Sequence, residues 1–201
     1  TIPKEIGNST NLKELWLYEN HLTGAFNNFT GTIPPFIFNM SRLKLLSLSN
    51  NYFSGMFPDK MCHTLSNLEE LYLRSLNLKG RISSQLSQCG KLHFLELGWN
   101  TLTGSIPSIL FNKSHLEFID ISHNKFDPIC LPENICGNLP NLKELYMSGI
   151  NLGGHILSQL SQCGNLSKIS LEMNNFVGSI PQTIGNLTNL EELYLGNNKL
   201  T

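Results

Sequence analysis

The sequence predicts a solenoid of the α/β class: a right-handed superhelix with a concave parallel β-sheet and convex turns and 3₁₀ segments. Its first sign is a leucine pattern, L-x-x-L-x-L-x-x-N-x-L-x-G-x-I-P, most complete from Leu92 to Pro107. The pattern recurs at spacings of 31, 25, 24, 24, 26, 24 and 24 residues, the period of leucine-rich repeats apart from the first. The copies open at Leu12, Leu43, Leu68, Leu92, Leu116, Leu142, Leu166 and Leu190. We therefore predict one leucine-rich-repeat domain over residues 1–201, with about eight repeats of ~24 residues.

Each repeat is expected to contribute one short strand. Leu95 and Leu97 alternate with Glu96, which is the period of a half-buried strand. Such a strand pairs in parallel with its neighbours, because the rest of the repeat forms the crossover. Phe53, Phe126 and Phe176, each ten residues after an opening leucine, are expected in the core. Gly and Pro interrupt every crossover, which favours turns and short 3₁₀ pieces over long helices.

An asparagine ladder is expected where the chain leaves each strand. A buried amide at this place can satisfy backbone groups that no strand partner reaches. Leu76 and Ile150 interrupt the ladder, and the same two repeats have Ser83 and Leu157 instead of proline. These shared departures, 74 residues apart, indicate a block duplication, but they do not explain how the two repeats satisfy their backbone. The ladder residues are Asn20, Asn51, Asn100, Asn124, Asn174 and Asn198.

Composition excludes several classes of partner. Lys and Arg number 14 against 15 Asp and Glu, a net charge of −1, so no strong field attracts nucleic acid or an anionic membrane. Charged residues make up 14% of the chain, below the usual quarter. The six histidines are scattered, so we expect neither a metal site nor a cofactor.

The five cysteines are an odd number, which argues against a complete disulfide framework. Cys89 and Cys163 share one repeat offset near inward positions, so we expect buried thiols there. Cys62 and Cys136 are likewise equivalent to each other. A local bridge between Cys130 and Cys136 is the alternative that we keep open.

Six N-glycosylation sequons are present. Four of them lie four residues before an opening leucine, on the expected convex side, and we expect at least two to be modified in the parent protein. The alternative is that this asparagine belongs to the repeat consensus. The sequon residues are Asn8, Asn28, Asn39, Asn112, Asn165 and Asn186.

A binding surface is predicted on the central part of the concave face. Aromatic side chains beside Arg and carboxylates are typical of protein-binding hot spots, and Trp16 with Tyr18 forms a second cluster. The alternative is that tyrosines of the recurring E-L-Y phrase only pack the sheet. The candidate ligand-binding residues are Tyr72, Arg74, Phe94, Glu96, Trp99, Phe118, Asp120 and His123.

No catalytic constellation is expected. Glu96 and Asp120 occupy the same offset on neighbouring strands, about 5 Å apart, but an open sheet offers nothing to raise a carboxyl pKa. The long first spacing indicates an insertion, AFNNFTG at 25–31. It is either a binding loop or a neutral surface insertion, and we favour the neutral interpretation because loop closure costs grow slowly with length.

The repeat tails carry a family resemblance. LTGSIPSIL (102–110) and FVGSIPQTIGNLTNL (176–190) resemble the plant-specific class marked by L-x-G-x-I-P-x-x-I/L-x-N-L. The phrases at 2–24 and 61–73 are similar to ectodomains of plant leucine-rich-repeat receptor kinases, in the subfamily that includes the flagellin receptor. The resemblance implies a single-pass plasma-membrane receptor whose concave or lateral surface binds a peptide or protein ligand or a co-receptor ectodomain, while a cytoplasmic Ser/Thr kinase reports binding.

We therefore expect an extracellular ligand- or co-receptor-binding segment of a plant receptor-like kinase, with immune perception as one role. The alternative is a non-signalling binder: a receptor-like protein without a kinase, or a secreted, apoplastic protein resembling the polygalacturonase inhibitors. The chain shows no cysteine-bearing cap, membrane span or kinase motif. We accordingly expect a fragment with exposed terminal repeats, attached to a membrane only through a span of its parent.

Overall fold

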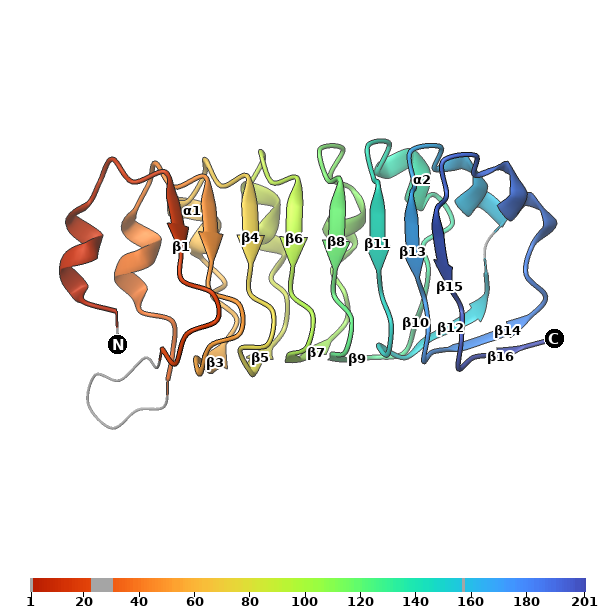
Figure 1. Ribbon diagram of the computed structural model, residues 1–201, viewed down its shortest axis with the longest axis horizontal. Helices are drawn as coiled ribbons and strands as arrows, with labels where there is room; N and C mark the ends of the chain where they lie inside the picture. The colour runs from red at the N-terminus through yellow and green to blue at the C-terminus, as the bar shows by residue number, and fades with distance from the viewer. Residues whose placement is uncertain (1, 23–30, 157) are drawn as a thin grey trace.

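A computed structural model describes residues 2–22, 31–156 and 158–201. Its strands stand side by side in one curved parallel sheet, with the chain termini at opposite ends (Figure 1). This confirms the predicted leucine-rich-repeat solenoid. The sheet order is β1 (Glu14–Trp16), β2 (Leu45–Ser47), β4 (Glu70–Tyr72), β6 (Phe94–Glu96), β8 (Phe118–Asp120), β11 (Glu144–Tyr146), β13 (Lys168–Ser170) and β15 (Glu192–Tyr194).

The register of this sheet separates core from surface. The middle residue of each strand pairs with the middle residue of the next, as Leu71 does with Leu95 and Leu95 with Ile119. These middle residues are buried from β1 to β13, so the first and third residues of each strand lie on the opposite, concave side of the sheet. Phe53, Phe126 and Phe176 lie buried in the same core, as expected.

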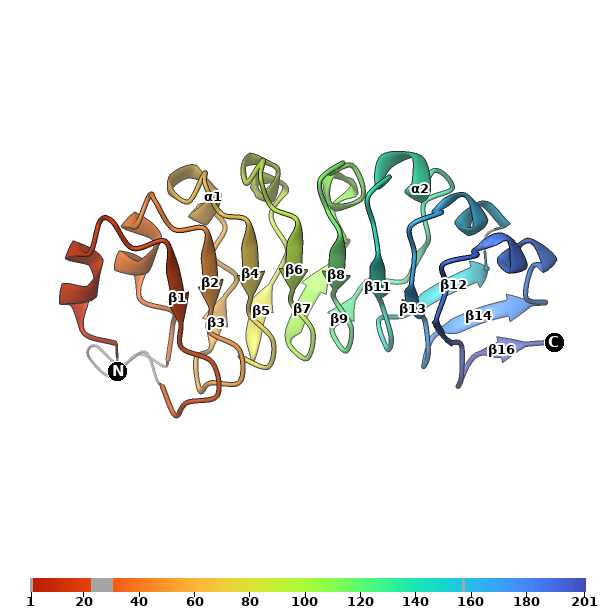
Figure 2. The ribbon, with the colours of Figure 1, turned by 45° about the horizontal axis from the view of Figure 1, so that its top comes forward.

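Two lateral four-stranded parallel sheets were not predicted (Figure 2). Five of their eight strands contain a glycine with positive φ, which turns the chain at the extended segment; these are Gly55, Gly80, Gly104, Gly154 and Gly178. At Gly104 φ is +77°, and an added Cβ would lie 2.7 Å from the Arg81 side chain of the preceding repeat. One sheet contains β3 (Gly55–Met56), β5 (Leu78–Gly80), β7 (Thr101–Gly104) and β9 (Lys125–Phe126), and the other β10 (Ile129–Cys130), β12 (Leu152–His155), β14 (Asn175–Gly178) and β16 (Lys199–Leu200).

The convex side has the short helical turns that the sequence predicts. Pro34, Pro107 and Pro181 precede three of them and fix the entry angle. Where Ser83 replaces this proline, its Oγ accepts from the Gln85 amide at 3.2 Å and caps the turn instead. The 3₁₀ helices are η1 (Lys4–Asn8), η2 (Pro35–Asn39), η3 (Ser84–Gln88), η4 (Ser108–Phe111), η5 (Ser158–Gln162) and η6 (Gln182–Asn186), and the α-helices are α1 (Met61–Thr64) and α2 (Ile135–Asn138).

The asparagine amides bridge neighbouring repeats. Asn100 Nδ2 donates to the Leu97 and Gly98 carbonyls of its own repeat and, at 2.8 Å, to the Leu73 carbonyl of the preceding one. Its Oδ1 accepts from the Leu76 and Leu78 amides. The next repeat therefore satisfies the backbone where the ladder is interrupted.

The same arrangement serves the second interruption. Asn174 donates to the Met147 carbonyl and accepts from the Ile150 and Leu152 amides. The other ladder residues, Asn20, Asn51, Asn124 and Asn198, also donate to backbone carbonyls.

The expectation of buried thiols at Cys89 and Cys163 is wrong. Cys62 is bonded to Cys89 and Cys136 to Cys163, with Cα–Cα distances of 5.0 and 4.8 Å. Each bond joins a convex helix to the end of the next 3₁₀ turn, so it links different offsets of adjacent repeats. The alternative bridge between Cys130 and Cys136 is also wrong, because Cys136 is occupied and Cys130 is free and exposed on β10.

Part of the first long repeat and one residue near η5 lie outside the described structure. The insertion at 25–31, apart from Gly31, and the sequon Asn28 lie outside the described residues, as does Leu157. None of the described helices combines the length and the hydropathy needed to cross a bilayer. Leu193 and Leu195 in the last repeat are only partly buried, in contrast with the central repeats.

Candidate functional site

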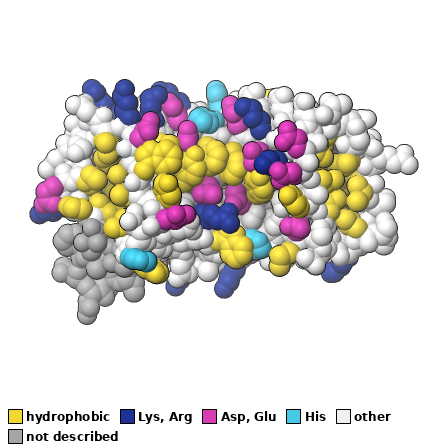
Figure 3. Space-filling model, in the orientation of Figure 1, with side chains coloured by type: hydrophobic (Ala, Val, Ile, Leu, Met, Phe, Trp, Pro, Cys, Tyr) yellow, Lys and Arg dark blue, Asp and Glu magenta, His cyan; other side chains and the backbone are white. Residues whose placement is uncertain are grey.

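Five aromatic side chains form a continuous row on the concave face, which we call the aromatic strip: Trp16, Tyr72, Phe94, Phe118 and Tyr146. Successive ring centroids lie 5.9, 4.5, 3.9 and 5.4 Å apart. Figure 3 shows hydrophobic side chains as a band across the middle of this face. The strip runs across the strands from β1 to β11, so six consecutive repeats lie beneath it.

Strand register and local hydrogen bonds explain the strip. Phe94 and Phe118 are the first residues of β6 and β8 and pair directly, so their rings stack within 6° of parallel. Tyr72 is a third residue, but its hydroxyl donates to Glu70 at 2.6 Å and draws the ring along the strand toward Phe94. The recurring E-L-Y phrase therefore orients a tyrosine ring. Tyr146 is held in the same way by Glu144, at 2.8 Å.

A small residue joins the two predicted aromatic clusters. Trp16 and Tyr72 lie two strands apart, about 9.6 Å at the usual spacing. Ser47 on the intervening β2 is buried and leaves room for the rings to meet. The Trp16 indole donates to Glu14 at 3.1 Å, and Tyr18 packs edge-on against Trp16. Nothing in the repeat pattern marks Ser47, because its contribution is the small size of its side chain.

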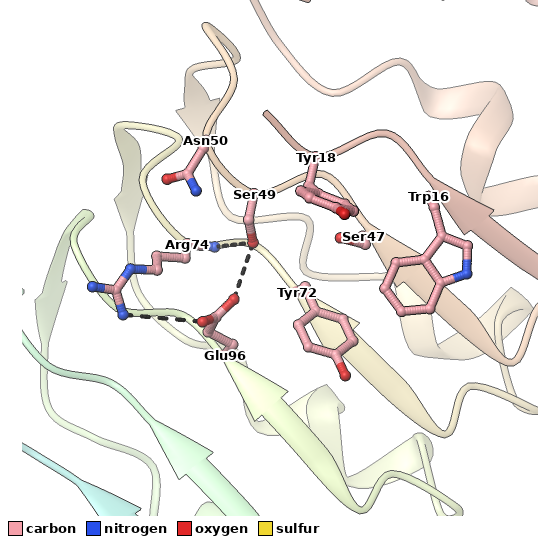
Figure 4. A pocket seen from close by; sticks show the side chains of 8 residues that line it. All are labelled: Trp16, Tyr18, Ser47, Ser49, Asn50, Tyr72, Arg74 and Glu96. Atoms are coloured by element: carbon pink, nitrogen blue, oxygen red, sulfur yellow. Dashed lines mark hydrogen bonds and ion pairs between the residues drawn. The ribbon is translucent and has the colours of Figure 1, made fainter. Parts of the chain in front are cut away.

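A polar cluster lies beside the strip: Ser49, Arg74, Glu96 and Asp120. Arg74 Nη1 is 3.1 Å from Asp120 Oδ2 and 4.0 Å from Glu96 Oε1. Ser49 Oγ donates to Glu96 at 3.1 Å and accepts from the Arg74 amide at 3.0 Å (Figure 4). An added Cβ at Gly98 would lie 2.5 Å from Asp120 Oδ2, so this glycine provides the space in which Arg74 and Asp120 meet.

Burial changes the acid–base properties of this cluster. Desolvation raises the pKa of Glu96 above its ordinary value, although the Ser49 hydrogen bond and Arg74 act in the opposite direction. This corrects the expectation that nothing on the open sheet raises a carboxyl pKa. Asp120 is fixed by Arg74 and by the Ser122 amide at 2.8 Å, so the two carboxylates form a preorganised polar surface.

Trp99 and His123 extend the cluster toward the end of the strands. Each residue lies three positions after the last residue of its strand, β6 or β8, and has a positive φ, 57° at Trp99 and 51° at His123. Their ring centroids lie 4.0 Å apart, and the Arg74 guanidinium carbon is 5.9 Å from the Trp99 ring. All eight predicted binding residues therefore lie on one surface.

The N-terminal part of this surface is hollowed into a shallow pocket of about 210 Å³. Its lining combines the polar cluster with the first two rings of the strip. The residues around it are Trp16, Tyr18, Ser47, Ser49, Asn50, Tyr72, Arg74 and Glu96 (Figure 4). Within the described ranges, no three His, Cys, Asp or Glu side chains are placed to hold a metal ion.

The described sequon residues, Asn8, Asn39, Asn112, Asn165 and Asn186, are exposed at or near the convex turns. Asn165 also belongs to a second, unpredicted ladder, because its Nδ2 donates to the Pro140 carbonyl at 2.9 Å. Asn67, Asn141 and Asn189 make the equivalent bond to the repeat before their own. A structural role therefore accompanies the sequon at Asn165.

Comparison with known proteins identifies the repeat and its relatives. The Leucine Rich Repeat family model matches residues 42–64 and 165–187. The chain is 34% identical over 168 residues to Receptor-like protein 39 of Arabidopsis thaliana, covering 82% of this chain and 19% of the relative. It is 31% identical to Receptor-like protein 9DC1 of Solanum pimpinellifolium, covering 84% and 22%. The chain thus spans about a fifth of the length of these relatives.

Solved structures of plant receptor kinases share the fold. The ectodomain of GASSHO1/SCHENGEN3 from Arabidopsis thaliana, in complex with Casparian strip integrity factor 2, superposes with a TM-score of 0.85 at 34% identity, over 99% of this chain and 23% of that one. The Arabidopsis receptor kinase HAESA, in complex with the peptide hormone IDA and the co-receptor SERK1, gives 0.83 at 32% identity, over 99% and 32%. These likenesses confirm the resemblance to plant receptor ectodomains.

Proposed function

We propose that this chain, a leucine-rich-repeat segment like those of plant receptor ectodomains, binds a peptide or protein ligand on its concave face. The observation that carries the proposal is the continuous aromatic strip beside the polar cluster. The proposed contact residues are Tyr72, Arg74, Phe94, Glu96, Trp99, Phe118, Asp120 and His123, together with Trp16.

The strip, together with Trp99 beside it, has the properties of a recognition surface. Trp16 and Trp99 are 49% and 51% exposed, and large apolar groups gathered on a solvent-open face favour a binding role over packing. Glu70 and Glu144 already hold the tyrosine rings in place. The surface is therefore rigid before a ligand arrives, and binding costs less side-chain entropy.

The relatives support the class of ligand. Structures of similar receptors contain a bound peptide hormone and, in one, a co-receptor, and we propose a peptide or protein ligand and a co-receptor ectodomain for this chain too. The sequence favours a receptor-like kinase as the parent protein. The curated relatives are receptor-like proteins, which supports the alternative of a parent without a kinase. In either case we assign binding to this chain and no catalysis.

We place the parent protein at the extracellular face of the plasma membrane, with secretion into the apoplast as the alternative. Two inter-repeat disulfides support an oxidising compartment. The exposed sequons support passage through the secretory pathway. Modification of at least two of them remains part of the proposal.

The proposal is tested by binding of secreted plant peptides and of the SERK1 ectodomain to the secreted 1–201 polypeptide. Replacing both Phe94 and Phe118 by Ser should weaken binding of any captured peptide at least tenfold, because the centre of the strip is lost. Tyr52→Ser is the matched control, since Tyr52 is exposed, lies outside the aromatic strip and, among the described residues, stacks with His21. Equal affinity of the Phe variant and the wild type would contradict the proposed site.

A further inference from the structure

The concave face carries an excess of negative charge that the whole chain does not. The described concave strands hold six carboxylates and a single cation, Lys168, whereas the entire chain has a net charge of only −1. The cationic side chains therefore lie mostly elsewhere on the molecule. The six carboxylates are Glu14, Glu70, Glu96, Asp120, Glu144 and Glu192.

Three of these carboxylates form no ion pair among the described residues, although Lys168 lies opposite Glu144 on the adjacent strand and attracts it. Arg74 pairs with Asp120 and approaches Glu96, and Lys168 pairs with Glu192 at 3.1 Å. Glu14, Glu70 and Glu144 instead accept hydrogen bonds from the indole and hydroxyl groups of the strip. Each of these carboxylates therefore lies directly beside an aromatic ring.

The stacking of the rings determines what can lie on them. Phe94 and Phe118 cover each other's faces at 3.9 Å, and Tyr72 and Tyr146 approach their outer sides. The solvent therefore meets mainly ring edges, which offer apolar contact but little attraction for a cation over a ring face. A long aliphatic stem that ends in a cation fits this surface, because the stem can cross the rings while the head group reaches a flanking carboxylate.

We propose that the ligand of this face contains an extended cationic segment, whose Lys or Arg stems cross the aromatic strip and whose head groups pair with Glu14, Glu70 and Glu144. The inference rests on the proposed binding function and names the chemistry of its ligand. Five strand spacings separate β1 from β11, about 24 Å, which is the length of about seven extended residues. Alternate side chains of such a segment all face the sheet.

The test uses an acetylated, amidated heptapeptide with Lys at its four odd positions and Gly between them. In a Trp99→Phe background, Trp16 is the remaining tryptophan of the chain, and its fluorescence reports binding at the strip. Two matched peptides replace Lys by norleucine, which keeps most of the stem without the charge, or by diaminopropionate, which keeps the charge on a short stem. The Lys peptide is expected to bind at least threefold more tightly than either.

Two variants separate the proposed contacts from the overall charge. Glu70→Gln with Glu144→Gln removes two charges beside the strip, while Gln can still accept the tyrosine hydrogen bonds. Glu69→Gln with Glu117→Gln removes two charges at the residues just before β4 and β8, where the side chains pair with Lys44 and Lys143. We expect roughly three- to tenfold weaker Lys-peptide binding in the first pair and less than a twofold change in the second.

Specific outcomes overturn the inference. Equal losses in the two variant pairs would show only long-range attraction. A norleucine peptide that binds as well as the Lys peptide would show that the charge is not recognised. A diaminopropionate peptide that binds as well would show that the long stem is not needed. Absence of any Trp16 response would also overturn it. The proposed function fails separately, when captured plant peptides bind the Phe94→Ser, Phe118→Ser variant as well as the wild type. A neutral or acidic captured peptide that needs these rings would retain the function and reject the cationic ligand.

Discussion

At the scale of single residues, the concave site depends as much on small residues that leave space as on the large residues that make contacts. Ser47 lets Trp16 reach Tyr72, and Gly98 lets Arg74 reach Asp120. Neither residue belongs to the repeat pattern, and neither carries a functional group at the contact. This is why the sequence predicted the contacting residues but not the positions that bring them together.

Gly98→Ala should therefore destabilise the protein through the polar cluster. The new methyl group would lie 2.5 Å from Asp120 Oδ2, so Asp120 must move away from Arg74, at a cost of about 1–3 kcal/mol in unfolding free energy. Urea denaturation measures this loss. Gly90→Ala is the control, because nothing lies within 4 Å of its added Cβ. Equal stability of the two variants would show that the cluster tolerates the methyl group.

Glu96 should make stability depend on pH. The pKa of Glu96 is raised in the folded state, so the folded protein holds this proton more tightly than the unfolded chain does. The contribution of Glu96 to the free energy of unfolding is therefore lost as pH rises through its folded pKa. Glu96→Gln removes that loss and can still accept from Ser49. We expect the unfolding free energy of the variant to rise relative to that of the wild type between acidic and neutral pH. Urea unfolding of the variant and the wild type at both pH values measures this change. An equal difference in unfolding free energy at the two pH values would contradict the assignment.

Asn100 should be far more important for stability than Asn20. Asn100 makes five backbone hydrogen bonds in two repeats, including the one that lacks its own ladder residue. Asn100→Ala would leave buried amides and carbonyls unpaired, and we expect a loss of roughly 2–4 kcal/mol. Asn20→Ala should cost less than about 1 kcal/mol, because Asn20 is exposed and water can replace its bonds. Chemical denaturation compares the two, and similar losses would refute the bridging role.

At the scale of elements, predictability follows periodicity. The strands repeat in phase with leucine, so β6 and β8 were predictable from Leu95 and from the same pattern one repeat later. The lateral sheets were missed because two to four extended residues before a glycine, as in β7, carry no alternation of their own. The disulfides were not predicted because each joins cysteines at different offsets of adjacent repeats. Comparing repeats matches only cysteines at the same offset, such as Cys89 with Cys163.

The two disulfides should contribute similarly, because they join the same pair of elements in duplicated blocks. Replacing Cys62 and Cys89 together by Ala removes a link that spans 27 residues, and we expect a loss of about 2–4 kcal/mol. The pair Cys136 and Cys163 should give a comparable loss.

Thermal unfolding under non-reducing conditions measures both variants, and peptide mapping by mass spectrometry verifies the pairing. Cys130→Ser serves as the control with little effect, because Cys130 is free and exposed. A peptide that links Cys130 to Cys136 would contradict the pairing itself.

At the scale of the whole molecule, the core of each described repeat packs against the adjacent repeats, so stability is set locally and transmitted along the axis. The architecture was predictable because one pattern fixes every repeat. The binding surface was only partly predictable, since it needs contacts across two strands, such as Trp16 with Tyr72 and Arg74 with Asp120. These contacts depend on the curvature and register of the assembled sheet.

Hydrogen exchange along the 1–201 polypeptide should reveal this one-dimensional behaviour. Leu95 and Leu97 around β6 are fully buried, whereas Leu193 and Leu195 around β15 are partly exposed, so amides of β15 should exchange faster than those of β6 because local opening costs less there. Mass spectrometry of proteolytic fragments measures the gradient. Appending a copy of residues 104–127 after Thr201, which continues the repeat in register because Thr201 corresponds to Thr103, should slow exchange in β15 and leave β6 unchanged, because the added repeat covers the terminal leucines. Uniform protection in the unextended chain would mean that the solenoid unfolds as one unit rather than repeat by repeat.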